Sequence, residues 1–225
     1  MKIRFYAHAS FRLEADGLAV ITDSYTPGPE NSGFDPIDEP ADIVIMSSAT
    51  DSFHSDPSHV RGDPVVVNAL ELAPEGAEVR GLQIRPFPAM ESTTLDFGQD
   101  PDANALYHFT LGGLRILHMG DIGNPVPQQH LDALAGNVDV LFALTGAHAT
   151  IALDDLDAAI DASGPRLVIP MHYYNNHQRT DNRAHSPSTT LQIGTITPTR
   201  ILTVVGDLAQ TPLARRAGLL TITSA

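Results

Sequence analysis

The chain lacks cysteine altogether, and lysine occurs once among its 225 residues, at Lys2. Without cysteine, disulfides, thiolate zinc sites and thiol catalysis are excluded. No apolar run approaches the length of a membrane span, and residues 1–6 read as a short alternating strand rather than a signal peptide. We therefore expect a cytoplasmic, soluble protein that has no membrane partner.

Positive charge is also scarce. The sequence holds 13 basic against 27 acidic residues, which gives a formal net charge of −14. Because binding to nucleic acid rests largely on neutralising phosphates, we expect no nucleic-acid partner and favour a small-molecule ligand. The apolar fraction of 42% is ample for a core. The length suits a single domain over residues 1–225.

Short runs rich in Val, Ile and Leu, bounded by Gly, Pro or Asp, recur along the chain and predict β-strands. These predicted strands cover residues 2–6, 10–14, 18–22, 43–46, 65–68, 79–86, 106–111, 114–118, 140–144, 167–170, 201–205 and 219–223. The pairs Asp16-Gly17 and Gly112-Gly113 separate neighbouring runs and predict hairpin turns.

Helix signals are fewer and lie in the second half, over residues 128–135 and 154–162. Strands in series, followed by alternating strands and helices, indicate a layered α/β fold in which helices cover sheets. Residues 23–39, 91–104 and 173–194 are polar or rich in Pro and Gly, and predict long loops. Long loops in a domain are often functional, although a surface insertion without a role is an equal alternative.

Two apolar runs end on residue types that bind metals. Asp121 follows the run at residues 114–118, and His172 follows residues 167–170. A third run, at residues 41–46, leads into Ser47-Ser48-Ala49-Thr50-Asp51-Ser52-Phe53, which has hydroxyl groups but no imidazole. A catalytic metal needs about three protein ligands and an open position. Whether the chain supplies three ligands decides whether it is an enzyme.

Five segments occur in an order and spacing that resemble a known family. They are residues 7–11, 41–46, 118–123, 139–151 and 169–173. Together they resemble the metallo-β-lactamase superfamily, in its ascorbate-phosphate-lactonase-like branch of small metal-dependent hydrolases. The resemblance implies an α/β, four-layer αβ/βα sandwich. It also implies a site at the sheet edges, with a small-molecule ligand in the cleft between the two halves.

Members of this family carry a His-x-His-x-Asp-His motif after the strand that matches residues 41–46. The register of that strand assigns Ser48, Thr50, Ser52 and Phe53 to the four motif positions. None of these side chains replaces an imidazole, so the motif is predicted to be degenerate. The family histidine expected after residues 79–86 is missing or has become Glu91.

The resemblance leaves Asp121, matching the family's bridging carboxylate, and His172, matching its last histidine, as the catalytic residues. Glu91 would complete a three-ligand set for Zn, Mn or Fe; a loop carboxylate without that role is the alternative. We expect either no metal or a single divalent ion, Zn or Mn. A dinuclear zinc centre is not expected.

Several further residues are predicted to line the site: His8, Ser48, Thr50, Ser52, His118, His148 and Tyr173. His118 either orients Asp121 or is a buried histidine with a structural role. A structural role is also the alternative for His8. A shifted alignment would bring Asp51 and His54 toward the site, whereas an exposed loop is the simpler interpretation of that segment.

Two classes of function follow. In the first, the chain is a one-metal hydrolase of lactone, ester or phosphoester substrates. In the second, it is a catalytically inactive, metal-free member that has been repurposed for ligand binding or regulation. A metal-free serine hydrolase is disfavoured because the chain has no Gly-x-Ser-x-Gly elbow.

Overall fold

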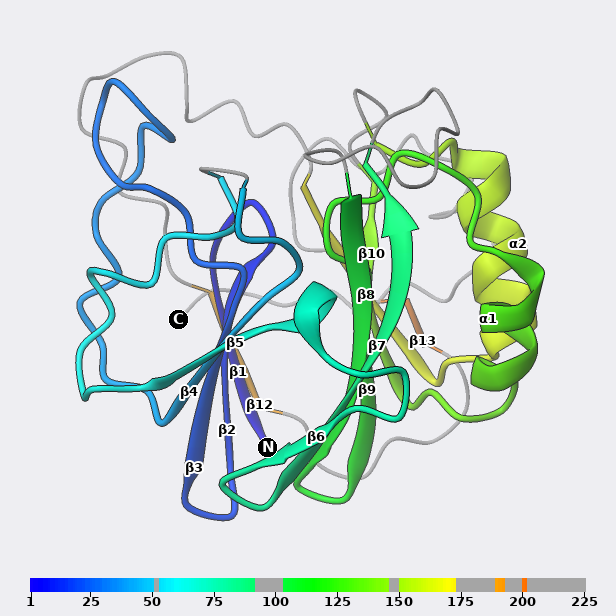
Figure 1. Cartoon of the computed structure of the whole chain (residues 1–225), viewed down its shortest axis with the longest axis horizontal. Helices are drawn as coiled ribbons and strands as arrows, with labels where there is room; N and C mark the ends of the chain where they lie inside the picture. Colours follow the sequence, from blue (N-terminus) through cyan, green and yellow to red (C-terminus); the bar gives the residue numbers. More distant parts are fainter. Residues whose placement is uncertain (51–52, 92–102, 146–149, 173–188, 193–199, 202–225) are drawn as a thin grey trace.

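Two β-sheets stand face to face at the centre of the molecule, and two helices lie against the outer side of one of them (Figure 1). The structure, a computed structural model of the chain, describes residues 1–50, 53–91, 103–145, 150–172, 189–192 and 200–201.

The first sheet has the strand order β12-β1-β2-β3-β4-β5. Its strands are β1 (Lys2–Ala7), β2 (Ser10–Ala15), β3 (Leu18–Thr22), β4 (Ile43–Met46), β5 (Val65–Asn68) and β12 (Thr189–Gln192). Strands β1, β2 and β3 pair antiparallel, whereas β3, β4 and β5 pair parallel.

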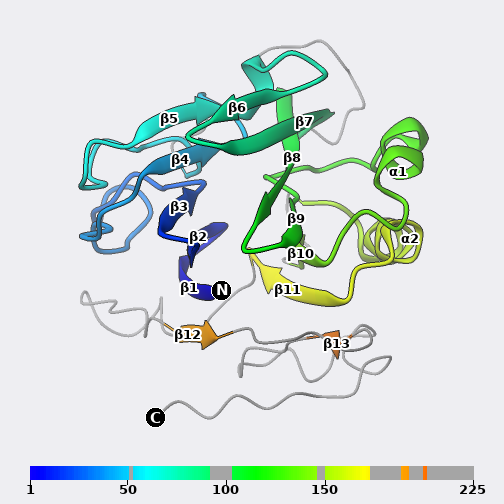
Figure 2. The ribbon, with the colours of Figure 1, turned by 90° about the horizontal axis from the view of Figure 1, so that it is seen from below.

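The second sheet has the order β13-β11-β10-β9-β8-β7-β6. Its strands are β6 (Ala77–Val79), β7 (Leu82–Met90), β8 (Ala103–Leu111), β9 (Leu114–His118), β10 (Val140–Leu144), β11 (Leu167–Met171) and β13 (Arg200–Ile201). A short 3-10 helix, η1 (Ala69–Glu71), links the two sheets between β5 and β6. The helices α1 (Gln128–Leu134) and α2 (Leu153–Ser163) lie beside each other over the second sheet (Figure 2).

Strand β4 shows how the alternation of side chains divides the core. Ile43 and Ile45 belong to the main hydrophobic cluster between the sheets, whereas Val44 and Met46 belong to a second cluster on the outer face. An entirely apolar strand is expected where both faces of a sheet are covered. Across the interior, the rings of Phe11 on β2 and Phe142 on β10 approach to 4.4 Å between centroids and join the sheets.

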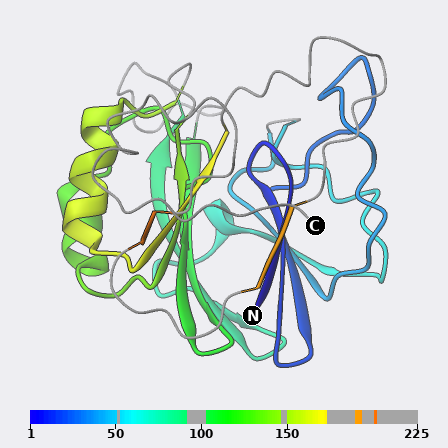
Figure 3. The ribbon, with the colours of Figure 1, turned by 180° about the vertical axis from the view of Figure 1, so that it is seen from behind.

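The outer face of the first sheet is covered by loops in the part of the chain that the structure describes. Tyr25, Phe34 and Ile37, from the segment between β3 and β4, are buried in the second cluster together with Val60. These loops lie on the opposite side of the molecule from α1 and α2 (Figure 3). The two stacked sheets of the predicted αβ/βα sandwich are confirmed, and helices form the outer layer of the second sheet. Over the first sheet, the outer layer of the described residues consists of loops rather than helices.

Most predicted strands and both predicted helices are confirmed, but two predictions were wrong in detail. The strand predicted at residues 79–86 is two strands, because Arg80 and Gly81, with φ of 51° and 81°, form a turn between β6 and β7. The loop predicted at residues 173–194 contains β12, which pairs with β1. The strand predicted at 219–223 lies outside the described residues. In the described part of the chain, no helix is long and apolar enough to cross a membrane.

Candidate metal centre

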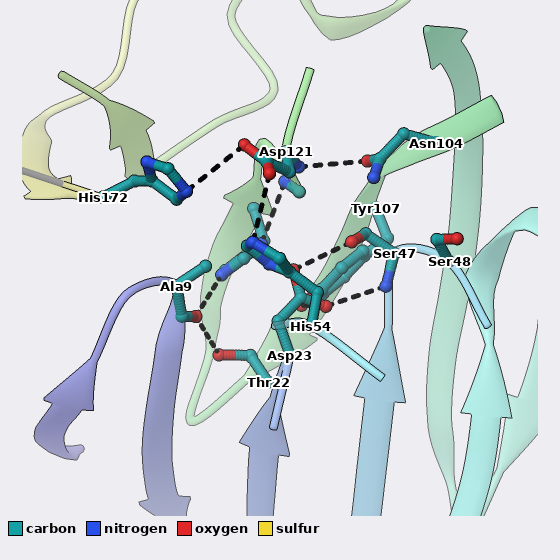
Figure 4. Close-up of polar contacts among 12 residues, drawn as sticks. Ala9, Thr22, Asp23, Ser47, Ser48, His54, Asn104, Tyr107, Asp121 and His172 are labelled. Carbon is teal, nitrogen blue, oxygen red and sulfur yellow. Dashed lines mark hydrogen bonds and ion pairs between the residues drawn. The ribbon is translucent and has the colours of Figure 1, made fainter. Parts of the chain in front are cut away.

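Three side chains with metal-binding atoms converge where strands of the two sheets end (Figure 4). Asp121 follows β9, His172 follows β11, and His54 lies in the segment after β4. The distances to the Asp121 carboxylate are 3.2 Å from His54 Nε2 and 3.6 Å from His172 Nε2. All three ligand atoms lie within 4.8 Å of one another. Two imidazoles and a carboxylate form a donor set that zinc and other divalent transition metals accept.

Asp23 holds the far side of the His54 ring. This carboxylate is fully buried and directly follows β3. Its Oδ2 lies 3.4 Å from His54 Nδ1 and accepts a hydrogen bond from the Ser47 hydroxyl at 2.9 Å, whereas its Oδ1 accepts one from the Ser47 backbone N–H at 2.7 Å. The Tyr107 hydroxyl donates a further hydrogen bond at 3.3 Å. When the ring is neutral, a carboxylate at Nδ1 favours the tautomer with its proton on Nδ1 and a lone pair on Nε2, the nitrogen that is directed at Asp121.

Asp121 is oriented through its backbone. Its N–H donates to Asn104 Oδ1 at 3.1 Å, and Asn104 is fully buried. Gly120, just before it, has a φ of 60°, and a Cβ there would lie 2.3 Å from Asn104 Oδ1. Only glycine therefore permits this close approach.

The Oδ1 atom of Asp121 is buried and accepts no hydrogen bond, although His172 lies nearby. A buried carboxylate oxygen without a hydrogen bond fits a place beside a cation.

His118, at the end of β9, is buried and connects the backbones around the centre. Its Nδ1 accepts a hydrogen bond from the N–H of Gly120 at 3.1 Å, and its Nε2 lies 2.9 Å from the carbonyl of Ala9. These partners define a neutral ring that donates through Nε2. Burial lowers the pKa of His118, in keeping with this neutral form. His118 therefore acts on Asp121 through the backbone of the intervening turn.

His8 lies at the rim of the centre. Its imidazole is half-buried, its ring centroid is 5.2 Å from that of His172, and its carbonyl accepts the His172 N–H at 2.9 Å. Burial, followed by the neighbouring His172 and His54, lowers the pKa of His8 to about 3. The ring is thus neutral at pH 7.

His54 and Asp121 shift each other's pKa in opposite directions. Burial alone would lower the pKa of His54, but hydrogen bonds to Asp121 and Asp23 raise it well above its ordinary value. Burial would likewise raise the pKa of Asp121, but its pairing with His54 and the nearby His172 hold it below its usual range. The position between the carboxylates of Asp23 and Asp121 therefore favours positive charge.

The structure brings together some predicted residues and separates others. Asp121 and His172 lie in one group, and His54, which the sequence register did not assign, is its third member. Glu91, the predicted third ligand, follows β7 and is not part of this group. Ser48 is buried, and its hydroxyl lies 2.9 Å from that of Thr50, away from the three ligand atoms (Figure 4). The remaining predicted site residues, Ser52, His148 and Tyr173, lie outside the described residues.

The motif register explains why an exposed loop was favoured over a shifted alignment for the segment that holds His54. The exposed loop was the wrong interpretation for His54, because this side chain is fully buried. A shift of one residue along the chain assigns the last motif histidine to His54 and leaves Phe53 at the preceding position. The neighbouring His59 has a structural role: its Nδ1 accepts the N–H of Ile37 at 2.9 Å, and its Nε2 lies 2.8 Å from the carbonyl of Tyr25. Asp23 was not predicted as a site residue. Its position directly after a run of apolar residues could have indicated one, as it did for Asp121.

Comparison with known sequences identifies metal-dependent relatives. The chain is 26% identical over 194 residues to a UPF0173 metal-dependent hydrolase of Geobacillus thermodenitrificans, covering 77% of this chain and 85% of the relative. It is 24% identical over 192 residues to a UPF0173 metal-dependent hydrolase of Thermococcus onnurineus, covering 77% and 84%.

Solved structures share the fold. A metallo-β-lactamase superfamily protein of Thermotoga maritima superposes with a TM-score of 0.59 at 24% identity, covering 78% of this chain and 77% of the other. A metallo hydrolase of Ignicoccus hospitalis superposes with a TM-score of 0.56 at 18% identity, covering 86% and 100%. The sequence pattern of the beta-lactamase superfamily domain (Lactamase_B_3) matches residues 2–172. Because this match spans well over half of the chain, the protein belongs to the beta-lactamase superfamily.

Proposed function

We propose that the protein is a hydrolase that binds one divalent metal ion through His54, Asp121 and His172. The observation that carries this proposal is the convergence of the three side chains, with ligand atoms within 4.8 Å, at the ends of strands from both sheets. The relatives named as metal-dependent hydrolases support the same class of chemistry. Zinc or manganese is the ion we expect, because both accept imidazole and carboxylate ligands in hydrolytic sites.

His54, Asp121 and His172 would hold the ion, which would supply Lewis acidity toward the scissile carbonyl or phosphoryl group and hydroxide from water at neutral pH. The residues of the chain position this chemistry. Asp23 fixes the tautomer of His54, and Asn104 fixes the turn that carries Asp121. His172 is about one-fifth exposed, whereas His54 is fully buried, so substrate approaches from the His172 side of the centre.

A single ion is proposed rather than two. In the described residues one group of three potential ligands is present, and three protein ligands are the number that one catalytic ion needs. The proposed substrates are lactones, esters or phosphoesters, in line with the resemblance to the ascorbate-phosphate-lactonase-like branch. An inactive, metal-free protein that binds a ligand is the alternative.

The metal content of the protein tests this function. Protein purified without chelator or affinity tag should contain about one zinc or manganese per chain by elemental mass spectrometry. The variant His54→Ala/Asp121→Ala should lose the metal together with hydrolysis of lactone and ester substrates. His130→Ala, which removes a histidine on α1, is the matched control and should keep both the metal and the hydrolytic activity.

Two outcomes would contradict the proposal. Wild-type protein without metal, even after zinc or manganese is supplied, would favour the metal-free alternative. Two ions per chain would refute the single-ion centre. Circular dichroism of each variant separates loss of metal from loss of fold.

A further inference from the structure

Three aromatic rings border the metal centre on one side. The rings of His8, Phe34 and Phe53, called the aromatic wall below, meet around His8: its centroid is 5.3 Å from that of Phe34 and 5.3 Å from that of Phe53. Residues far apart in the sequence supply these rings, from the β1–β2 turn, the loop layer and the segment after β4.

The aromatic wall is continuous with the centre. His8 contacts the His172 ring at 5.2 Å between centroids, and His172 in turn stacks on His54 at 5.7 Å. The Tyr25 ring packs against Phe34, with 5.4 Å between the two centroids, and helps to keep the Phe34 ring buried. A ligand that reaches the ion past His172 therefore meets the wall as well.

Phe53 presents apolar surface at this place. It is 39% exposed, and the other large exposed hydrophobic side chains in the described residues are Val65 and Val66 on the edge strand β5. Exposed aromatic surface beside a polar centre is typical of a ligand site, because a few polar groups fix orientation while apolar surface provides affinity.

The backbone of His8 adds a second observation. His8 has a φ of 51°, in the left-handed region that disfavours side chains with a Cβ. His172 has a φ of 54°, and the two residues are joined by the hydrogen bond from the His172 N–H to the His8 carbonyl. Strained residues of this kind cluster at functional sites, where surrounding structure holds them in place.

The charges around the centre favour a neutral ligand. A divalent ion would be balanced formally by the carboxylates of Asp121 and Asp23, and the chain carries a net charge of −14. The arginine–ring contacts among the described residues join Arg4 to Tyr6 and Arg85 to Phe87, so neither adds positive charge to the aromatic wall. The described residues around the centre would compensate a phosphate dianion poorly, whereas an uncharged carbonyl group would not be penalised there.

We propose that the aromatic wall binds the apolar group of a carboxylic ester or lactone whose carbonyl lies at the metal centre. This inference rests on the proposed function and narrows it: phosphoesters are excluded as preferred substrates, and small esters without an apolar substituent are poor ones. Hydrolysis adds water across the acyl–oxygen bond, giving the carboxylic acid and the alcohol, or the hydroxy acid from a lactone.

Binding of product-like anions to the cobalt(II)-loaded protein tests the proposal without relying on turnover. Acetate, phenylacetate and phenyl phosphate are titrated while the visible absorption of the ion is recorded. Phenylacetate should bind about tenfold or more tightly than acetate, as expected for burial of a phenyl group, and more tightly than phenyl phosphate.

Variants locate the effect. Phe53→Ser should bring the dissociation constants of acetate and phenylacetate to a ratio of about one, while the cobalt content stays the same. Phe53→Leu should retain part of the preference for phenylacetate. Val66→Ser, a comparable loss of exposed apolar surface on β5, should leave the preference unchanged.

Equal binding of acetate and phenylacetate, tighter binding of phenyl phosphate, or a preference untouched by Phe53→Ser would overturn the inference while leaving the metal centre intact. Protein that shows no cobalt absorption before any anion is added would overturn the proposed function, and this inference with it. The two failures are therefore distinguished within one experiment.

Discussion

At the scale of single residues, hydrogen bonds with buried protein groups orient the side chains of the centre. Asp23 is the clearest case, because its two oxygens serve Ser47, Tyr107 and His54 together. Such a carboxylate costs free energy to bury and is retained where several donors satisfy it. Its value here is the orientation of His54.

Replacing Asp23 by asparagine should weaken metal binding about 10- to 100-fold, because an amide no longer fixes the tautomer and basicity of His54. The dissociation constant of zinc is measured by competition with a chromophoric chelator. Asp42→Asn is the control: Asp42 Oδ2 accepts the N–H of Ala19 at 2.8 Å, so the variant loses a carboxylate hydrogen bond elsewhere in the same sheet. Equal affinities in the two variants would show that Asp23 does not act on the centre.

At the scale of elements, the loop layer covers the outer face of the first sheet, as α1 and α2 cover that of the second. It buries Tyr25, Phe34 and Ile37 against β3 and β4, and it carries one ring of the aromatic wall. Loops lack the internal hydrogen bonds of helices, so side chains must satisfy their buried backbone groups. His59 has this role, through Ile37 and Tyr25.

His59→Ala should therefore lower the free energy of unfolding by about 1–3 kcal/mol, since it leaves the buried N–H of Ile37 without its acceptor. The change is measured by denaturant unfolding, and amide hydrogen exchange should quicken first at Ile37 and Phe34. His130→Ala, on α1, removes a hydrogen bond to the carbonyl of Pro88 on β7 and should change stability by less than about 0.5 kcal/mol. A uniform rise in exchange over both sheets would argue against a local role for His59.

At the scale of the whole molecule, two sheets of mixed direction bring the carboxyl ends of β3, β4, β9 and β11 to one region. Residues separated by more than a hundred positions, such as His54 and His172, meet there. The rest of the scaffold must hold these ends in register. One contributor is the buried Asp139, which ties β9 to β10 by accepting two hydrogen bonds from Arg115 at 2.9 Å on one oxygen.

Asp139 makes the stability of the molecule depend on acid. The hydrogen bond from Arg115 holds the pKa of Asp139 at about 2, below the ordinary 3.8. A carboxyl group with a lowered pKa in the folded state stabilises the protein at neutral pH, and the contribution declines below about pH 5 and is lost as the pH falls toward 2. Since Arg115 is 38% exposed, solvent screening reduces the contribution to about 1 kcal/mol.

Asp139→Asn should accordingly cost about 1 kcal/mol at pH 7, and its deficit relative to wild type should narrow as the pH falls from 5 toward 2. Unfolding free energies across this range measure the effect. Asp132→Asn, on the exposed face of α1, should give a curve parallel to that of wild type. A deficit that stays constant with pH would mean that Asp139 acts through packing rather than charge.

Much of the fold was predictable from local pattern. Strands such as β3, β4 and β9 are short runs of Val, Ile and Leu bounded by polar residues, and they lie where the pattern indicates. The turn at Arg80-Gly81 was not predicted, because a positive φ at an arginine leaves little trace in the sequence. Strand β12 was not predicted either, since its residues Thr189–Gln192 become a strand by pairing with β1.

The sequence by itself determined where most strands lie along the chain and that Asp121 and His172 follow buried runs, because both follow from the pattern of apolar side chains. Its composition also excluded thiol chemistry. Only the tertiary structure decided that His54, rather than Glu91, approaches them, and that Asp23 and the aromatic wall surround the group. The physical reason is that the loop after β4 permits more than one register along the chain. Burial against the ends of β3, β9 and β11 selects the one that pairs His54 with both carboxylates.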